Sequence, residues 1–306
     1  MLPELPTRVL RTLDLAAPLD DGRAFVAAAS GLARVAGRLL VVGDDLAHLA
    51  SFAEDPAEPG SAHRVLPDLL PAGHAERKRA KPDLEALTAL PPSPAFPHGA
   101  LLAVGSGSTA ARERAVLIPL DPAGAPGGAA VVRDLAPVLA PLREHRDEVN
   151  VEAALVLGDE LVLVSRAHSA MPENLVARFA LAAVAAWADG AASVLAPRSV
   201  APWRVGEIDG VPLGVTDAAA HPDGGWVFSA AAEDTSDAYA DGAVAGAVAG
   251  RVDASGAVVA LGRLTPTAKV EGILARPVPG GTELLMVTDA DDPDAPASLL
   301  AAVLPG

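Results

Sequence analysis

The feature that most constrains this chain is a phrase that recurs along it. Each copy has an acidic residue followed by Ala or Gly, a short apolar strand, a Gly turn, a second apolar strand and a polar cluster. Three clear copies begin at Glu152, Asp217 and Glu271, and two looser ones begin near Gly31 and Asp83. Repetition at a spacing of about sixty residues predicts a stacked or circular β architecture.

The five units predict an all-β fold, a five-bladed β-propeller formed by a single domain over residues 1–306. A third apolar strand follows each pair, and propellers have ~4–8 blades of four strands. The segment from Arg8 to Leu13 is expected to supply the outer strand of the last blade. This strand would close the ring, and closure removes exposed sheet edges. A sixth blade within residues 190–214 is the alternative.

Three segments have helical character. The Asp134–Leu142 segment can cap a helix with one apolar face, and residues 75–81 form a short charged segment that Pro82 ends. The Ala-rich run over 177–188 fits either a strand or a helix, because periodicity does not separate the two for a short apolar run.

Composition excludes several classes of protein. The chain is 51% hydrophobic and only 3% aromatic, so Ala, Val and Leu must fill the core. It has no cysteine, hence no disulfide or thiolate site. A net charge of −16 argues against a nucleic-acid partner and favours cations. We see no signal peptide, and the apolar run 179–188 is too short to cross a membrane, so we expect a cytoplasmic monomer with no membrane partner.

Polar residues are expected to gather at one mouth of the channel. In a propeller the innermost strand starts on the face where the second strand ends. The starts of the inner strands carry acids at Asp83 or Glu85, Glu152, Asp217 and Glu271. The ends of the second strands carry Asp44, Asp45, Ser106, Ser108, Arg166, His168, Glu233, Asp234, Asp289, Asp291 and Asp292.

So many acids at one mouth predict a cation site. Crowded carboxylates repel, which raises their pKa values or calls for a cation. Oxygen ligands without cysteine suit Ca²⁺ or Mg²⁺. The candidate ligands are Glu152, Asp217, Glu271, Asp289, Asp291 and Asp45. In the alternative interpretation the inner-strand acids only bond neighbouring backbone amides and end the strand.

Other side chains at the mouth suit an anionic ligand. The segment from Gly105 to Thr109, followed by Arg112 and Arg114, can form an anion nest in which Ser106 and Ser108 add donors. A Gly/Ser hairpin turn with surface arginines is the alternative. Arg166 would help to orient the anion, and His168 is the one histidine to consider as a base. The basic run over 77–81 either overhangs the acidic mouth or forms a solvated helix face.

Several of these segments resemble a bacterial family of predicted β-propellers of unknown function. They are VVGDD at 41–45, KPDLEAL at 81–87, GSGSTAARER at 105–114, NVEA at 150–153, DGVPLGVTDAA at 209–219, AEDTSDAYADG at 232–242, KVEG at 269–272 and TDADDP at 288–293. The resemblance covers most of the chain from residue 31 onward and brings no activity. It implies that five further residues lie near the site, namely Lys81, Asn150, Lys269, Tyr239 and Asp241.

Three functions fit these residues. The first is a Ca²⁺- or Mg²⁺-dependent hydrolase of a small anionic substrate such as a phosphoester or lactone, with Glu152, Asp217, Glu271 and His168 as catalytic candidates. Its substrate-binding candidates are Ser106, Ser108, Arg112, Arg114, Arg166, Lys81, Lys269 and Tyr239. The second is a non-catalytic binding module with a structural cation. The third is a glycoside hydrolase, against which the shortage of aromatic stacking platforms counts.

Overall fold

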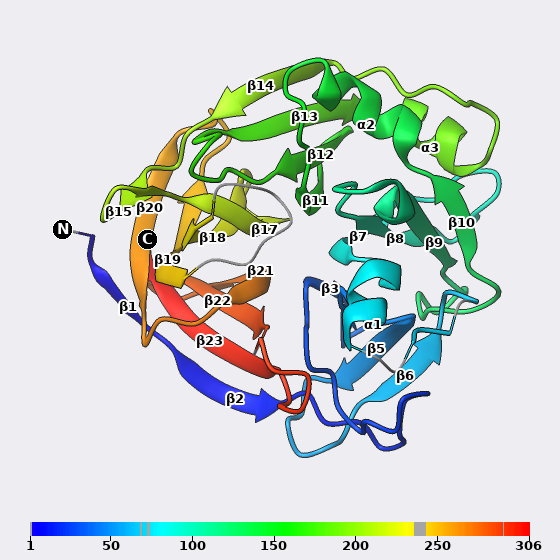
Figure 1. The fold of residues 1–306 in the computed structure, drawn as a ribbon, viewed down its shortest axis with the longest axis horizontal. Helices are drawn as coiled ribbons and strands as arrows, with labels where there is room; N and C mark the ends of the chain where they lie inside the picture. The colour runs from blue at the N-terminus through cyan, green and yellow to red at the C-terminus, as the bar shows by residue number, and fades with distance from the viewer. Residues whose placement is uncertain (1, 68, 72–73, 236–242, 290) are drawn as a thin grey trace.

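The computed structural model is a five-bladed β-propeller whose blades surround a central channel (Figure 1). It describes residues 1–306 apart from positions 1, 68, 72–73, 236–242 and 290. The predicted fold class is therefore confirmed. Within each blade the strands that follow one another along the chain pair antiparallel from the inside outward, and the N-terminal strands β1 and β2 join the fourth and fifth blades.

The blades begin where the repeated phrase begins. The first consists of β3 (Gly31–Val35), β4 (Arg38–Val42), β5 (His48–Ala53) and β6 (Ser61–Arg64). The second consists of β7 (Leu84–Leu90), β8 (Ala100–Gly105), β9 (Arg114–Pro119) and β10 (Val131–Asp134). The third consists of β11 (Val151–Leu157), β12 (Glu160–Ser165), β13 (Asn174–Ala180) and β14 (Ser199–Trp203). The last two are built on β17 (Gly214–Ala220), β18 (Trp226–Asp234), β19 (Ala243–Val252) and β20 (Val258–Thr265), and on β21 (Val270–Val278), β22 (Gly281–Thr288) and β23 (Ser298–Pro305).

The N-terminal segment closes the ring. As predicted, β2 (Arg8–Thr12) pairs antiparallel with β23 as the outer strand of the fifth blade. The preceding β1 (Glu4–Pro6) adds a parallel strand to β20 in the fourth blade, which sequence reasoning missed. Residues 190–214 supply β14 and the small hairpin of β15 (Glu207–Ile208) and β16 (Val211–Pro212), not a sixth blade.

The core is divided among the blade boundaries. The five apolar clusters of buried described residues each lie between two adjacent blades and consist largely of Ala, Val and Leu. Rings meet between the third and fourth blades, where Trp203 lies 4.8 Å from Trp226 and 5.1 Å from Phe228 between ring centroids. Aromatic side chains also lie in two other clusters, as Phe96, Phe179 and Trp187 between the second and third blades and as Phe52 between the fifth and first.

Short helices lie in the connections between strands. They are α1 (His74–Ala80), the 3₁₀ turn η1 (Ala110–Arg112), α2 (Ala136–Arg143) and α3 (Leu181–Ala188). The ambiguous Ala-rich run contains both structures, since β13 ends at Ala180 and α3 follows at once. None of the described helices is long and apolar enough to cross a membrane. The one that bears on the site is α1, which Figure 1 shows beside the inner strand β3.

Four inner strands contain the same irregularity near their start. The register with the second strand shifts by one residue in β7, β11, β17 and β21. The residue left without a pairing partner is Glu85, Glu152, Thr216 or Glu271 respectively. A β-bulge re-aims the side chain of its extra residue and is common next to active sites.

Candidate functional site

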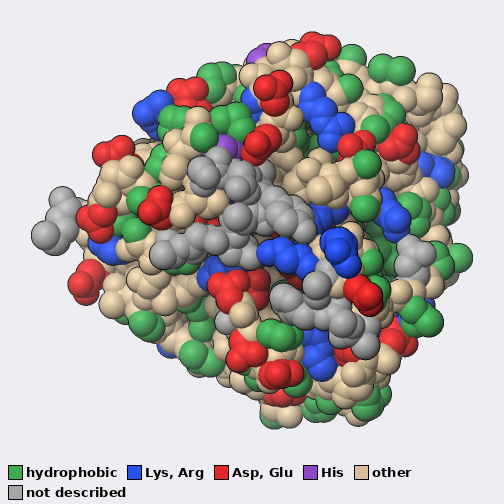
Figure 2. Space-filling model, viewed as in Figure 1, with side chains coloured by type: hydrophobic (Ala, Val, Ile, Leu, Met, Phe, Trp, Pro, Cys, Tyr) green, Lys and Arg blue, Asp and Glu red, His purple; other side chains and the backbone are tan. Residues whose placement is uncertain are grey.

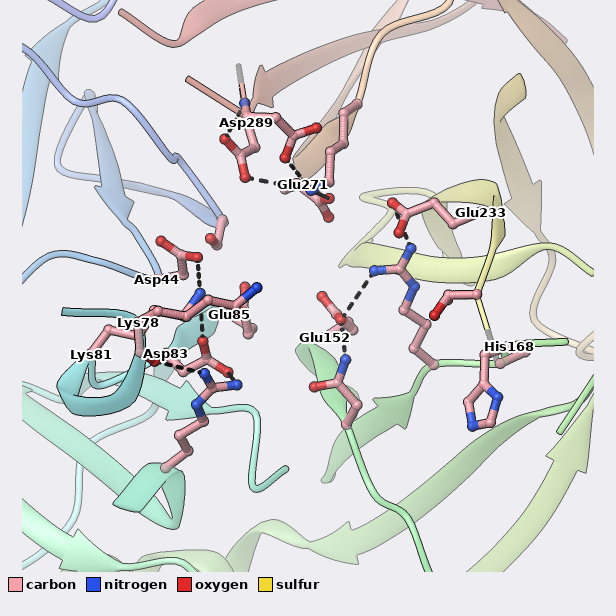
Figure 3. Close-up of a pocket in the computed structure, with 18 residues that line it drawn as sticks. Asp44, Lys78, Lys81, Asp83, Glu85, Glu152, His168, Glu233, Glu271 and Asp289 are labelled. Carbon is pink, nitrogen blue, oxygen red and sulfur yellow. Dashed lines mark hydrogen bonds and ion pairs between the residues drawn. The ribbon is translucent and has the colours of Figure 1, made fainter. Parts of the chain in front are cut away.

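A pocket of about 110 Å³ opens at the mouth of the channel where the inner strands start (Figure 3). Its lining residues come from all five blades and from the segment after α1: Ser30, Asp44, Lys78, Lys81, Asp83, Glu85, Arg112, Asn150, Glu152, Arg166, Ala167, His168, Glu233, Thr235, Lys269, Glu271, Asp289 and Asp291. Eight of them are carboxylates and five are lysine or arginine, so acids exceed cations by three. Figure 2 shows lysine and arginine side chains beside acids near the centre of this face.

Three of the four bulges deliver a glutamate to this pocket. Burial raises the pKa of Glu85 and of Glu271 well above the usual range, and neighbouring carboxylates, including Glu152 in both cases, add to the effect. Burial also raises the pKa of Glu152 to about 7, although Arg166 opposes the rise. Titratable groups whose pKa values are strongly shifted in a pocket are typical of functional sites.

The first wall of the pocket joins the first and second blades. Carboxylate oxygens of Asp44, Asp83 and Glu85 lie within 4.8 Å of one another. The Lys81 ammonium contacts Asp44 and lies 2.9 Å from Asp83 Oδ1, and Arg112 Nη1 lies 2.8 Å from Asp83 Oδ2. Burial raises the pKa of Asp44 to about 6 despite this lysine. Of the described residues, these three acids alone cluster closely enough to hold a cation, and Lys81 already supplies a positive charge there.

The second wall joins the third and fourth blades through one arginine. Arg166 Nη2 lies 2.8 Å from Glu233 Oε1, and its Nη1 lies 3.5 Å from Glu152 Oε1. Asn150 donates a hydrogen bond of 2.6 Å from Nδ2 to the same Glu152 oxygen. His168 lines this wall, 3.6 Å from the Glu148 carboxylate. Glu152 is thus held in one orientation by a donor and a cation.

The third wall belongs to the fifth blade. Lys269 Nζ lies 2.7 Å from Asp291 Oδ1, 3.5 Å from Asp289 Oδ2 and 3.8 Å from Glu271 Oε1. The other oxygen of Glu271, Oε2, is buried and has no hydrogen-bond partner among the described residues. The lysine therefore lies nearer to the two aspartates, and Glu271 keeps a buried oxygen that lacks a hydrogen-bond donor among the described residues.

The structure brings together most of the predicted site residues but not Asp217. Glu152, Glu271, Asp289, Asp291, His168, Arg112, Arg166, Lys81, Lys269 and Asn150 all line the pocket. Asp217 is 2% exposed and accepts a hydrogen bond of 2.7 Å from the backbone N–H of Ile273 in the next blade. The bulge residue of its strand is Thr216, so the acid lies one position too late to reach the mouth. Its placement agrees with the structural alternative.

Four other candidates also lie outside the pocket lining. Asp45 bonds Arg23 at 2.8 Å and Arg77 at 3.2 Å in an adjoining depression. Ser106 is fully buried against Asp83, and Ser108 accepts a hydrogen bond of 2.9 Å from Arg112 Nη1. Arg114 begins β9. Of the residues proposed for an anion nest, Arg112 and Ser106 are engaged with Asp83.

The sequence placed Asp83 or Glu85 at the mouth without deciding between them and gave neither a role in the site, whereas both line the pocket. Both residues lie in the motif KPDLEAL. Only the register shift in β7 indicates that Glu85 occupies the position in its blade that Glu152 and Glu271 occupy in theirs. The basic run does approach the acidic mouth, since Lys78 and Lys81 line the pocket. Tyr239 and Asp241 lie outside the described residues.

Comparison with known proteins identifies a family but no activity. A sequence model described as a family of unknown function (DUF6910) matches residues 77–293. No curated protein sequence matches. The similar solved structures include a luciferin-regenerating enzyme (9% identity, TM-score 0.44, 92% of this chain and 94% of that chain covered). They also include a putative glycoside hydrolase from Parabacteroides distasonis (11%, 0.44, 99% and 97%) and a streptogramin B lyase (9%, 0.41, 92% and 80%). At these values the similarity carries no inference about chemistry.

Proposed function

We propose, from the premise that this chain belongs to the DUF6910 family of unknown function, that it is a hydrolase of a small anionic substrate and depends on Ca²⁺ or Mg²⁺. One observation carries the proposal: among the described residues, eight carboxylates from five blades converge in one small pocket with five cationic side chains. An anion would be repelled by this excess of acids unless a further cation entered with it.

The ion would be held by Asp44, Asp83 and Glu85. Their oxygens are already close together, and carboxylates are the ligands that Ca²⁺ and Mg²⁺ prefer. Bound there, the ion would polarise an oxygen of the substrate and lower the pKa of a water molecule. Lys81 contacts two of the three ligands, so the ion must compete with its ammonium.

Glu152 is the general base in this proposal. A general base works best when its pKa lies near the operating pH, and burial places that of Glu152 at about 7. The hydrogen bond from Asn150 holds the Glu152 carboxylate in place. In this proposal the oriented carboxylate accepts a proton from the attacking water. A phosphoester or a lactone carries the polarisable oxygen that such a base and ion would act on.

The test combines ion binding with activity. We expect Ca²⁺ or Mg²⁺ to raise the melting temperature of the protein, by linkage, and a chelator to reverse the rise. Glu85→Gln should abolish the rise, and Glu152→Gln should lower kcat on the responsive phosphoester or lactone by about 10²- to 10⁴-fold. Glu160→Gln is the matched control. Glu160 begins β12, does not line the pocket and forms ion pairs with Arg178 and Arg198.

Two results would overturn the proposal. One is a melting temperature that neither ion changes, and the other is an absence of turnover with the ion present. An ion-dependent melting temperature without turnover would instead favour a non-catalytic binding module. The glycoside hydrolase hypothesis loses support, because none of the described lining residues is Trp, Tyr or Phe, the usual stacking platforms for sugars.

A further inference from the structure

Four of the five lysine and arginine side chains that line the pocket contact its own acids. Lys81 and Arg112 contact Asp83, Arg166 contacts Glu233 and Glu152, and Lys269 contacts Asp291 and Asp289. An incoming anion would have to break these ion pairs. Each broken pair would leave a buried carboxylate without a neutralising charge, which is unfavourable. The pocket therefore offers more capacity to accept hydrogen bonds than to donate them.

Part of the unused acceptor capacity lies on two glutamates, and the buried Oδ1 of Asp44 also has no hydrogen-bond partner among the described residues. Glu271 is 5% exposed, lines the pocket and has the unpartnered, buried oxygen Oε2. Glu85 also lines the pocket, and it forms no hydrogen bond or ion pair with any residue that the structure describes. A buried carboxylate oxygen left without a donor costs free energy, and a ligand that donates to it recovers that cost.

We infer that the substrate carries a positively charged amine, which Glu271 binds through Oε2 while Glu85 and Glu152 add negative charge from the other blades. This inference rests on the proposed function and names the substrate class: a small molecule with an ammonium group as well as the anionic group that the divalent ion would bind. In Figure 3 Glu271 and Glu152 belong to opposite walls of the pocket.

An ammonium group fits Glu271 better than a second metal ion does. A divalent ion takes six or more oxygen ligands at short range, and the described acids come within 4.8 Å of one another in a group of three only at Asp44, Asp83 and Glu85. An ammonium group has three donors and needs only one close acceptor with further negative charge nearby. The open oxygen of Glu271, with Glu152 across the pocket, supplies both.

The test uses pairs of probes that differ only in charge. The full chain is melted with a chelator present, in ethanolamine or ethylene glycol, and in 1,3-diaminopropane or 1,3-propanediol, at equal ionic strength. We expect the amines to raise the melting temperature and the diols not to. Glu271→Gln should weaken amine binding about 10- to 100-fold, the worth of a hydrogen bond to a charged group, and Glu160→Gln should leave it unchanged.

Failure of this inference is distinguishable from failure of the proposed function. Equal effects of amines and diols on the wild-type chain, or amine binding that survives Glu271→Gln unchanged, would overturn the amine site even if the protein hydrolyses a phosphoester or lactone. The comparison on the wild-type chain does not depend on whether the variant folds. Amine binding in chelator without any ion-dependent hydrolysis would keep the amine site and overturn the hydrolase.

Discussion

The inner strands β17 and β21 both carry a bulge after a valine and an acid near their start, but place these acids in different environments. In β21 the bulge residue is Glu271, which reaches the pocket, whereas in β17 it is Thr216. The Thr216 hydroxyl donates to the backbone oxygen of Val270, and Asp217 accepts the backbone N–H of Ile273. The position relative to the bulge therefore decides whether an acid faces the ligand or joins two blades.

The two acids also differ in what compensates their burial. Burial raises the pKa of both, but Asp217 is balanced by backbone donors, those of Ile273 and Ala218. Glu271 has the charges of Lys269, 3.8 Å away, and of Arg166 to offset its burial, but its second oxygen has no donor among the described residues. A satisfied buried acid stabilises the ring, whereas one with an open acceptor remains available for a ligand.

The largest expected effect concerns the dependence of the mouth acids on side-chain cations. Arg166→Met leaves Glu152 and Glu233 without their shared counter-ion and should lower the free energy of unfolding by about 3–5 kcal/mol. Urea denaturation at neutral pH measures it. Arg204→Met is the control, because Arg204 pairs with Glu173 at the exposed rim and should change stability by less than about 1 kcal/mol. Equal stability of the two variants would contradict the difference expected between the buried ion pairs of the pocket and the exposed pair at the rim.

A smaller effect is expected at the residue after the bulge. A methyl group at Gly272 would lie 2.5 Å from Val287 Cγ2 and 3.0 Å from Leu32 Cβ, so Gly272→Ala should cost about 1–3 kcal/mol. The matching position of the third blade is Ala153, which is accommodated there with no exposed surface. Thermal melting of Gly272→Ala beside Ala153→Gly tests whether the fifth blade is the tighter one. A neutral Gly272→Ala would mean that β21 can shift away from β3.

The smallest effect is a change in pH dependence at Asp217. Its raised pKa means that the folded chain binds this proton more tightly than the unfolded chain does, so its contribution to stability is present at acid pH and is lost as pH rises through the raised pKa. Glu152 is the charged group that adds to the rise. Asp217→Asn keeps an acceptor for Ile273 without the charge.

The variant should therefore gain on the wild type as pH rises, by at most about 1.4 kcal/mol per pH unit for one proton. Urea denaturation from pH 4 to 9 in the presence of a chelator measures the difference. Parallel curves for the two proteins would show that the folded and unfolded chains bind the same number of protons at Asp217 over this range, which would contradict a raised pKa. A loss of stability in the variant relative to the wild type as pH rises would contradict it as well.

Much of the fold followed from local patterns. Short apolar runs bounded by Gly and Pro mark the strands. Each pair of strands needs a turn with characteristic residues, so the spacing of these turns predicts five blades. The closing strand β2 was also predictable. The C-terminal segment supplies only three strands of the fifth blade, and the N-terminal segment contains a further apolar strand that can complete it. The parallel pairing of β1 with β20 joins residues far apart along the chain and left no local signal.

The sequence by itself determined that acids gather at one mouth, because strand alternation and blade order place the starts of inner strands beside the ends of second strands. Only the tertiary structure decided which acids face the pocket. A shift of one residue at a bulge exchanges Asp217 for Thr216 and brings in Glu85. The pairing of Lys81, Arg166 and Lys269 was likewise settled in three dimensions. Register and ion pairing depend on strands and charges from different blades, and a linear pattern does not record their separation in space.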